Sequence, residues 1–349
     1  MKKIILIFLL LIPLKVKASA YIVMDTDNNR VIEGNNIHAP YLIASTSKIM
    51  TALVVINNTD IKNIIKINEE VLKSYGSGIY VKVGERISIE DLLYGLMLRS
   101  GNDAAIALAD YIGGSMEGFS LMMNETAKAI GMKNTNFINS HGLENNKNEG
   151  NMSTAYDMAL LSSYAIQNDI YKKISSTKKH SVKTNMNFYL WHNKNKLLSS
   201  YKYCTGGKTG FTKLAKRTLV TTASKDNMNF TVVTFKDGND FNNHQSYYEK
   251  AFKNHKSYTI YNKGNIETDL SNTYIEKDIK VTLTKSEFNR LKVDIKYNKQ
   301  NVTKIVGHIN LTLDGTELES VPILQKEKQE KKESFFKKFF RKIGLKWLI

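Results

Sequence analysis

Strand-like segments at both ends of a long helical stretch constrain the fold of this chain more than any other sequence feature. Near the N-terminus, Tyr21–Val31 contains two short apolar runs on either side of a polar turn, which is typical of a β-hairpin. Runs rich in β-branched residues return at Thr218–Lys225 and Asn229–Gly238, again separated by a short polar turn. The sequence therefore predicts a sheet built from both ends of one domain, with helices packed on it.

The residues between these strands follow the pattern of helices. Apolar residues fall near one face from Ser45 onward, and residues 86–131 continue the helical pattern through a polar break at Arg99–Asp103. A polar stretch then leads into another helix at about Thr154, and a last helix near Gln245–Phe252 closes the domain. The long helical insertion predicts a helical subdomain beside the sheet.

These elements define a first domain over residues 21–257. From Tyr258 the character of the chain changes, because short segments alternate apolar and polar residues with turn residues between them. This pattern predicts a small β-rich domain over residues 258–324, in which no catalytic constellation is found. Residues 325–349 begin with a charged linker and form a separate segment.

The first twenty residues have the features of a secretory signal. Two lysines precede an apolar run over residues 4–14, and the small residues Ala18 and Ala20 frame a cleavage site. The apolar run is too short for a membrane-spanning helix, which needs about 20 residues, although an uncleaved N-terminal anchor is the alternative. We therefore expect residues 1–20 to be removed and the mature chain to work outside the bacterial cytoplasm.

The C-terminal segment predicts a helix that lies in a membrane surface. On a helical projection its bulky apolar side chains share about a third of the circumference, and its lysines and arginine take the other side; the apolar residues are Phe336, Phe339, Phe340, Ile343 and Trp347. A basic amphipathic helix of this kind binds an anionic membrane surface. The alternatives are a helix docked on the protein's own core or a nucleic-acid-binding tail, and secretion argues against nucleic acid.

Charge and cysteine content narrow the possibilities further. The net charge of +17 favours an anionic partner, of which nucleic acid, acidic lipid and cell-wall polymer are examples. The single cysteine, Cys204, excludes an intrachain disulfide, and no histidine is placed to activate it, so we expect an inert thiol. The seven histidines form no metal-binding pattern, so no metal is expected.

The first motif with chemical meaning is Ser45-x-x-Lys48. Residues three apart share one face of a helix, so the Lys48 amine can reach the Ser45 hydroxyl. A serine nucleophile needs a neighbouring base, and a lysine can serve where burial or other cations lower its pKa. The start of a helix also offers backbone N–H groups to a developing oxyanion. Alone, the motif is weak, and its default interpretation is an N-cap serine followed by a solvated lysine.

The second motif, Ser100-Gly101-Asn102, lies at the break in the helical block. These residue types form ordinary turns. The functional interpretation is a hydroxyl and an amide presented to a cleft. Ser100 could then relay a proton to a leaving amine, and Asn102 could hold Lys48 and a substrate amide by hydrogen bonds.

The third motif, Lys208-Thr209-Gly210, lies just before a predicted strand. It is either a glycine-rich turn or a strand edge that directs a cation and a hydroxyl at an anionic group. Under the second interpretation, Gly210 leaves room for a substrate to lie against the backbone.

The three motifs in this order, on a helix start, a helix break and a strand edge, form the set found in penicillin-binding proteins and β-lactamases. With YIVMD, DLLYGLMLRSGNDAAIALA, STAYDMA and GGKTGFT, they make residues 21–255 resemble the low-molecular-weight serine D-alanyl-D-alanine carboxypeptidases of peptidase family S11. The resemblance implies an α/β (α+β) fold, in which a β-lactamase/transpeptidase-like domain combines an antiparallel sheet with a helical subdomain. A small all-β domain and a C-terminal amphipathic helix follow.

The resemblance also implies the chemistry. Ser45 would attack the carbonyl between the last two D-alanines of a peptidoglycan stem peptide, with Lys48 as general base. Ser100 would pass a proton to the departing D-alanine. The backbone N–H groups of Ser45 and Phe211 would form the oxyanion hole.

The third motif would bind the substrate, because Lys208 and Thr209 would hold the terminal carboxylate of the peptide. β-Lactam antibiotics would act as covalent inhibitors, and no metal or organic cofactor would be needed. The chain departs from the family at Lys216, where glycine is common, and with Lys213 and Arg217 this adds positive charge beside the site.

The motifs bear differently on three rival functions. A class A β-lactamase would carry an E-x-x-L-N loop, which the sequence lacks. A D,D-endopeptidase that cuts peptidoglycan crosslinks fits the motifs as well as a carboxypeptidase does. A non-catalytic wall-binding protein is disfavoured by the intact motifs. His141 could be read as a catalytic base, but the resemblance makes it a structural loop residue.

Overall fold

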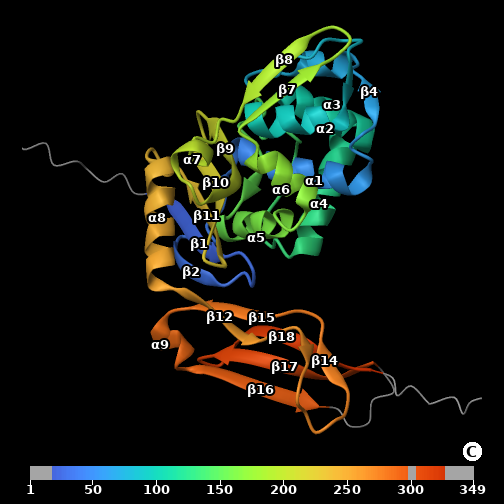
Figure 1. The fold of residues 1–349 in the computed structure, drawn as a ribbon. Helices are drawn as coiled ribbons and strands as arrows, with labels where there is room; N and C mark the ends of the chain where they lie inside the picture. Colours follow the sequence, from blue (N-terminus) through green and yellow to red (C-terminus); the bar gives the residue numbers. More distant parts are fainter. Residues whose placement is uncertain (1–17, 298–303, 327–349) are drawn as a thin grey trace, which may run out of the picture. The chain divides into compact units, whose positions relative to one another are not determined.

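The computed structural model describes residues 18–297 and 304–326 (Figure 1). The predicted signal segment lies outside these residues, apart from its last three positions. The predicted C-terminal helix, with all five of its apolar residues, also lies outside them. The chain divides into two compact units, one ending at Lys256 and one beginning at Ser257, and each is described by itself.

An antiparallel sheet of five strands forms the centre of the first unit. Its strands are β1 (Ala20–Asp25), β2 (Val31–Asn35), β9 (Cys204–Thr212), β10 (Lys216–Lys225) and β11 (Met228–Phe235). Their order in the sheet is β2-β1-β11-β10-β9, so the N-terminal hairpin pairs with strands that follow the helical block. This confirms the prediction of a sheet built from both ends of the domain. The strand β9 lies at one edge.

Period-two alternation along the strands separates two hydrophobic cores. In β1, Ile22 and Met24 belong to the larger core, whereas Val23 between them belongs to a smaller core on the opposite face. The helix α8 (Asp240–Asn254) covers the smaller core, and Figure 1 shows it on one side of the sheet, with most of the other helices on the opposite side. Each face of the sheet is therefore buried.

The helical block packs against the other face. Its helices are α1 (Lys48–Asn58), α2 (Ile89–Tyr94), α3 (Asn102–Gly113), α4 (Met116–Ile130), α5 (Ala155–Ala165) and α6 (Asp169–Ser176). Side chains cap several of these helices, as when the Ser88 and Thr154 hydroxyls accept hydrogen bonds from the third residue of α2 and α5. Gly131 ends α4 in the left-handed conformation. These local signals explain why α5 begins close to the predicted Thr154, whereas α6 was not predicted and α8 begins five residues before the predicted Gln245.

Several short strands were not predicted. The pairs are β3 (Tyr41–Leu42) with β6 (Met152–Ser153), β4 (Ile64–Lys66) with β5 (Arg86–Ser88), and the hairpin of β7 (Lys179–Lys183) with β8 (Phe188–His192). A short helix, α7 (Leu197–Ser200), follows this hairpin and leads into β9. Much of the β7–β8 hairpin is solvent-exposed, and the Phe188 side chain is 68% exposed. The segments KHSVK and FYLWH do not alternate apolar and polar residues, so this pattern did not predict the hairpin.

The second unit is β-rich, as expected. Five antiparallel strands form the sheet β13-β14-β18-β17-β16, and two more form the pair β12-β15; in chain order they are β12 (Lys256–Tyr261), β13 (Gly264–Asn265), β14 (Thr273–Ile275), β15 (Ile279–Leu283), β16 (Leu291–Tyr297), β17 (Ile305–Leu313) and β18 (Thr316–Gln325). One short helix, α9 (Lys285–Phe288), carries a capping box between Thr284 and Glu287. Within the described parts of both units, no helix is long and apolar enough to cross a membrane.

The core beneath α8 gives a test of this packing. Phe230 is fully buried there and contacts Phe252 with ring centroids 5.2 Å apart. We expect Phe230→Ala to lower the free energy of unfolding by about 3–5 kcal/mol, because it leaves a cavity in a closed core. Urea unfolding followed by tryptophan fluorescence measures the change. The matched control is Phe188→Ala on the exposed hairpin, expected to change stability by less than about 0.5 kcal/mol. Equal losses in both variants would contradict this description of the core.

Candidate active site

Ser45 lies in a short 3-10 turn, Ala44–Ser47, directly before α1. It caps neither helix, since the N-cap positions are Ile43 and Ser47, so the N-cap interpretation of Ser45 is wrong. Ala44 has a φ of 48°, in the left-handed region that non-glycine residues rarely adopt. The backbone therefore turns sharply just before the serine, and Ser45 lines the largest cavity described below.

The Lys48 amine joins three separate segments of the chain. Lys48 is fully buried, and its Nζ atom lies 3.2 Å from Ser45 Oγ, 2.7 Å from Asn102 Oδ1 and 2.5 Å from the His141 carbonyl oxygen. The Asn102 amide nitrogen donates to the Tyr75 carbonyl at 2.6 Å, which fixes the orientation of its side chain. The structure thus brings together two of the three predicted motifs around one nitrogen.

Burial lowers the pKa of Lys48 well below its ordinary value, and the nearby ammonium groups of Lys208 and Lys194 lower this pKa further. A neutral amine has two N–H bonds and one lone pair. The Asn102 and His141 oxygens accept the two N–H groups, which leaves the lone pair directed at the Ser45 hydroxyl. This is the geometry that a general base needs.

The second motif is held at a distortion of the helical block. A π-helical turn, Gly95–Arg99, ends at Ser100, whose φ of 63° is left-handed, and α3 begins at Asn102. Distortions of this kind recur at functional sites. Ser100 is nearly buried and lines the cavity beside Ser45. The neighbouring Asp103 carboxylate accepts hydrogen bonds from two backbone N–H groups of the preceding loop, at 2.5–3.1 Å, and holds that loop against the site.

The third motif lies on β9, the edge strand beside the Ser45 turn. Lys208 is buried and donates to the Thr209 carbonyl oxygen at 2.7 Å, while the Thr209 side chain lines the cavity. Burial, with a contribution from Lys194, lowers the pKa of Lys208 to about 7. A strand at a sheet edge keeps one row of backbone groups out of strand pairing. β9 therefore offers N–H groups next to Ser45.

The structure shows a packing role for Gly210. A Cβ atom at this position would lie 2.4 Å from Thr218 Oγ1 and 3.0 Å from the Ser45 amide nitrogen. The missing side chain thus lets β9 approach the serine turn, and Gly210 also lines the cavity described below. Phe211 is the next residue of β9 after Gly210. Its side chain is 63% exposed and lines the cavity.

Two contributors to the site had no motif in the sequence. One is the His141 carbonyl, which holds Lys48; burial and Lys48 lower the pKa of the His141 imidazole to about 3, so the ring is no base at neutral pH. The other is Lys194, in the loop after β8, which donates to Ser77 Oγ at 3.0 Å. The only sequence signal for Lys194 is that it lies in a lysine-rich segment.

The remaining predicted residues near the site have limited roles. Burial raises the pKa of the Cys204 thiol to about 11, so it stays protonated at neutral pH. Arg217 lines the cavity, but its charge is paired with Asp240 at 2.6 Å. Lys216 is exposed at the start of β10 and does not line the cavity.

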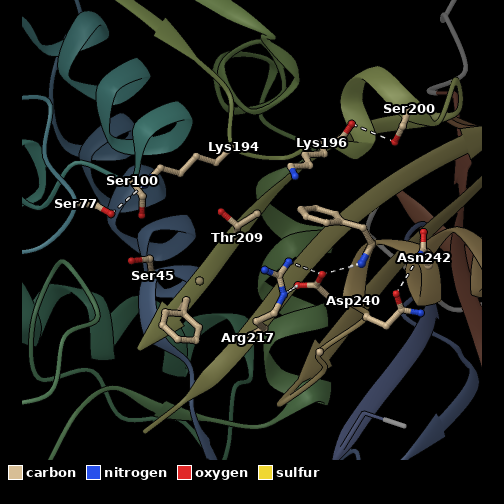
Figure 2. A pocket seen from close by; sticks show the side chains of 15 residues that line it. Ser45, Ser77, Ser100, Lys194, Lys196, Ser200, Thr209, Arg217, Asp240 and Asn242 are labelled. Carbon is tan, nitrogen blue, oxygen red and sulfur yellow. Dashed lines mark hydrogen bonds and ion pairs between the residues drawn. The ribbon is translucent and has the colours of Figure 1, made fainter. Parts of the chain in front are cut away.

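Residues of all three motifs line one cavity of about 790 Å³ (Figure 2). Its lining residues are Ser45, Ser77, Ser100, Lys194, Lys196, Ser200, Thr209, Gly210, Phe211, Arg217 and the segment 238–242. Among the residues that the structure describes, no cluster of His, Cys, Asp or Glu could hold a metal ion. The arrangement of nucleophile, base and nearby cations can support acyl transfer to a serine.

A fold of this type with a Ser–Lys pair at the edge of an antiparallel sheet is shared by the serine D,D-peptidases and the β-lactamases. A family model described as D-alanyl-D-alanine carboxypeptidase, peptidase S11, matches residues 11–239. The chain belongs to this family.

Individual relatives agree with the family match. D-alanyl-D-alanine carboxypeptidase DacF of Bacillus subtilis is 30% identical over 341 residues, which are 90% of this chain and 86% of the relative. D-alanyl-D-alanine carboxypeptidase DacC of Escherichia coli is also 30% identical, and the match covers 90% of this chain and 85% of DacC. The crystal structure of DacD from Francisella tularensis has a TM-score of 0.68 at 27% identity, covering 93% of this chain and 95% of that one. Penicillin binding protein 5 from Haemophilus influenzae shares the fold, with a TM-score of 0.74 at 24% identity over 89% and 97% of the two chains.

The two lysines give a prediction for pH dependence. The rate constant for acylation by a penicillin should rise with pH through the lowered pKa of Lys48, where the neutral base forms. It should fall above a pH of about 7, where Lys208 loses the charge that attracts the carboxylate of the inhibitor. Stopped-flow or mass-spectrometric kinetics between pH 5 and 10 measure this profile.

Lys208→Arg is the matched control, because arginine stays protonated over this range. We expect this variant to lose the falling limb and to keep the rising one. A wild-type rate that climbs by about tenfold per pH unit up to pH 10 would mean an unperturbed lysine base, and would contradict the assignment.

Proposed function

We propose that the chain is a serine D,D-carboxypeptidase that removes the terminal D-alanine from peptidoglycan stem pentapeptides through an acyl-enzyme on Ser45. The observation that carries this proposal is the buried Lys48 amine, whose two N–H groups have fixed acceptors while the Ser45 hydroxyl lies 3.2 Å away. A protein that only bound the cell wall would have no use for this costly arrangement. The alternative of a non-catalytic wall-binding protein is therefore disfavoured.

In the proposed acylation step, Lys48 takes the proton of Ser45 while the serine oxygen attacks the carbonyl carbon between the last two D-alanines. The developing oxyanion accepts hydrogen bonds from the backbone N–H groups of Ser45 and Phe211. The first of these lies in the opening turn of a helix, where N–H groups have no intrahelical acceptor. The second belongs to the edge strand β9 and directly follows Gly210, which packs against the Ser45 amide.

The leaving D-alanine departs with a proton that Ser100 passes to its amine. Its carboxylate binds Lys208 and Thr209, and Asn102 holds both Lys48 and a substrate amide. Water then hydrolyses the acyl-enzyme and restores the Ser45 hydroxyl. Every step uses groups that the chain itself supplies, so the reaction proceeds without a metal or an organic cofactor. A penicillin follows the same acylation path and remains on the serine.

We further propose the domain division and the location of the protein. Residues 1–20 would act as a signal peptide, residues 21–257 would form the catalytic domain, and residues 258–324 a β-rich domain. Residues 325–349 would hold the enzyme at the outer face of the cytoplasmic membrane, next to the cell wall. The supporting observations are the secretory pattern of residues 1–20 and the basic amphipathic pattern of the C-terminus.

Covalent labelling tests the nucleophile. The mature protein incubated with a penicillin should gain the mass of one inhibitor molecule, and Ser45→Ala should gain none. Lys48→Met should acylate about 10²–10⁴-fold more slowly, because it removes the general base. Ser47→Ala is the matched control, since the Ser47 hydroxyl donates to the Ala44 carbonyl, whereas the Lys48 amine bonds to Ser45, Asn102 and His141. An adduct on Ser45→Ala would refute the proposed nucleophile, and absence of D-alanine release from a pentapeptide would refute the carboxypeptidase.

Sedimentation with membranes tests the C-terminal segment. Deletion of residues 335–349 should release the protein into the supernatant, because both the apolar face and the basic residues are lost. A second variant, in which Phe336, Phe340 and Trp347 become serine, keeps the basic charge and should also be released. If the truncated protein still sediments with vesicles of anionic lipid, the proposed anchor is wrong.

A further inference from the structure

The loop over residues 139–151 holds more of the site than the His141 carbonyl alone. Much of its hydrogen bonding is internal. The Asn139 side chain accepts a hydrogen bond from the His141 backbone N–H at 3.2 Å and donates to the Leu143 carbonyl at 2.9 Å. The Asn151 side chain donates to the Asn139 carbonyl at 2.8 Å, which joins the two ends of the loop. A loop braced in this way is stiff, so a contact at one of its residues constrains the others.

Glu144 ties this loop to the edge strand. The Thr212 hydroxyl, at the end of β9, donates to one oxygen of the Glu144 carboxylate. Thr212 is buried, and its hydroxyl also accepts a hydrogen bond from the Ala215 backbone N–H at 3.0 Å. The Glu144 side chain packs against Gly150, where a Cβ atom would lie 3.2 Å from Glu144 Cγ. Packing and hydrogen bonding thus direct the carboxylate toward β9.

The backbone of Glu144 makes a second tie, to the loop that carries Tyr75. The Tyr75 hydroxyl donates to the Glu144 carbonyl oxygen at 3.0 Å, and the Tyr75 carbonyl accepts from the Asn102 side chain at 2.6 Å. Asn102 and the His141 carbonyl in turn both hold the Lys48 amine. These hydrogen bonds close a ring around the amine, and the carboxylate of Glu144 extends the ring to β9.

The end of β9 matters for the proposed acylation, on which this inference rests. Thr212 directly follows Phe211, whose backbone N–H is the proposed second donor to the oxyanion. Pairing between β9 and β10 ends at Thr212, which lies opposite Lys216 next to the connecting turn. A donor to the oxyanion must lie within about 2.7–3.1 Å of the oxygen. The hydrogen bond from Thr212 into the loop therefore holds the strand end on which this donor lies.

We propose that Glu144 is a positioning residue for acyl transfer. Its carboxylate fixes the end of β9 relative to the ring that holds Lys48. It thereby sets the separation between the attacking Ser45 oxygen and the Phe211 N–H that receives the oxyanion. Glu144 fills this role as a hydrogen-bond acceptor, so its negative charge is not required.

Stopped-flow acylation by a chromogenic β-lactam tests this role in the full mature chain, because it separates the acylation rate constant from the dissociation constant of the noncovalent complex. Glu144→Ala should lower the acylation rate constant by about 10–100-fold, since a misplaced N–H stabilises the transition state less. The dissociation constant should change by less than about threefold, because Thr209 is held by its pairing with Leu219 of β10. Glu144→Gln keeps an acceptor oxygen for Thr212 and should stay within about threefold of wild type in both constants.

The other end of the hydrogen bond gives an independent test. Thr212→Ser keeps the hydroxyl and should acylate like wild type, whereas Thr212→Val should lose as much as Glu144→Ala. Because the two residues act through one bond, the double variant should be no slower than the slower single variant. Glu149→Ala is the matched control, since this exposed carboxylate of the same loop bonds to the Asn145 side chain at 2.8 Å. It should leave acylation within about twofold of wild type.

The positioning role is overturned if Glu144→Ala acylates at the wild-type rate, or if the losses in the double variant simply multiply. A loss in Glu144→Gln as large as in Glu144→Ala would mean that the charge is needed, and would overturn the role as an acceptor. If Glu144→Ala does not fold, the comparison of Thr212→Val with Thr212→Ser decides, and equal rates in these two variants overturn the proposal. Absence of a penicillin adduct and of D-alanine release in wild type would instead refute the proposed function itself.

Discussion

The burial of one lysine amine is the constraint on which the rest of the site depends. A fully buried Lys48 is stable only where its polar hydrogens find acceptors, and these come from two places, the start of α3 and the loop at His141. Ser45 lies three residues away on the same turn. Because each segment is held by the same nitrogen, a shift in any of them would leave a buried polar group unpaired. The left-handed conformations of Ala44 and Ser100 persist because this network fixes the backbone on both sides.

Close packing of backbone against backbone complements this polar network. Gly142 has a φ of 87°, and a Cβ atom there would lie 2.0 Å from the Ala44 carbonyl oxygen. Gly210 plays the same part on the opposite side, against Thr218 and the Ser45 amide. The serine turn is therefore held between two glycine contacts, one from a loop and one from the edge strand. An edge strand is ordinarily a liability for aggregation, but here its unpaired side faces the serine turn, and this arrangement makes the backbone of β9 available to a bound peptide.

The sequence predicted those features that depend on local pattern. Apolar and β-branched runs predicted the central strands, helical periodicity predicted the helical block, and the three-residue spacing predicted Lys48 beside Ser45. The contact of Lys48 with Asn102 joins residues 54 positions apart, and only the functional interpretation of the second motif suggested it. The His141 contact spans 93 positions and uses a backbone carbonyl, which no side-chain motif can report. Lys194 was missed for a related reason, since its importance comes from burial beside other cations. The crowding at Gly210 could not be predicted, because contacts across strands depend on tertiary packing.

Lys48 and Lys208 need different protonation states: Lys48 acts as a neutral base, and Lys208 binds a carboxylate as a cation. Both lose solvation on burial, which lowers the pKa of each; the Lys208 ammonium lowers the pKa of Lys48 further, and the Lys194 ammonium lowers the pKa of both. The groups around the two lysines differ. The lone pair of neutral Lys48 has the Ser45 hydroxyl as its partner, whereas Lys208 lies next to Thr209, where the proposed carboxylate binds. An incoming carboxylate stabilises a proton on Lys208, and the resulting charge opposes protonation of Lys48. Binding of an anionic substrate thus favours the state in which one lysine is a cation and the other a base, so the site selects carboxylate-ended peptides by the same electrostatics that activates its nucleophile.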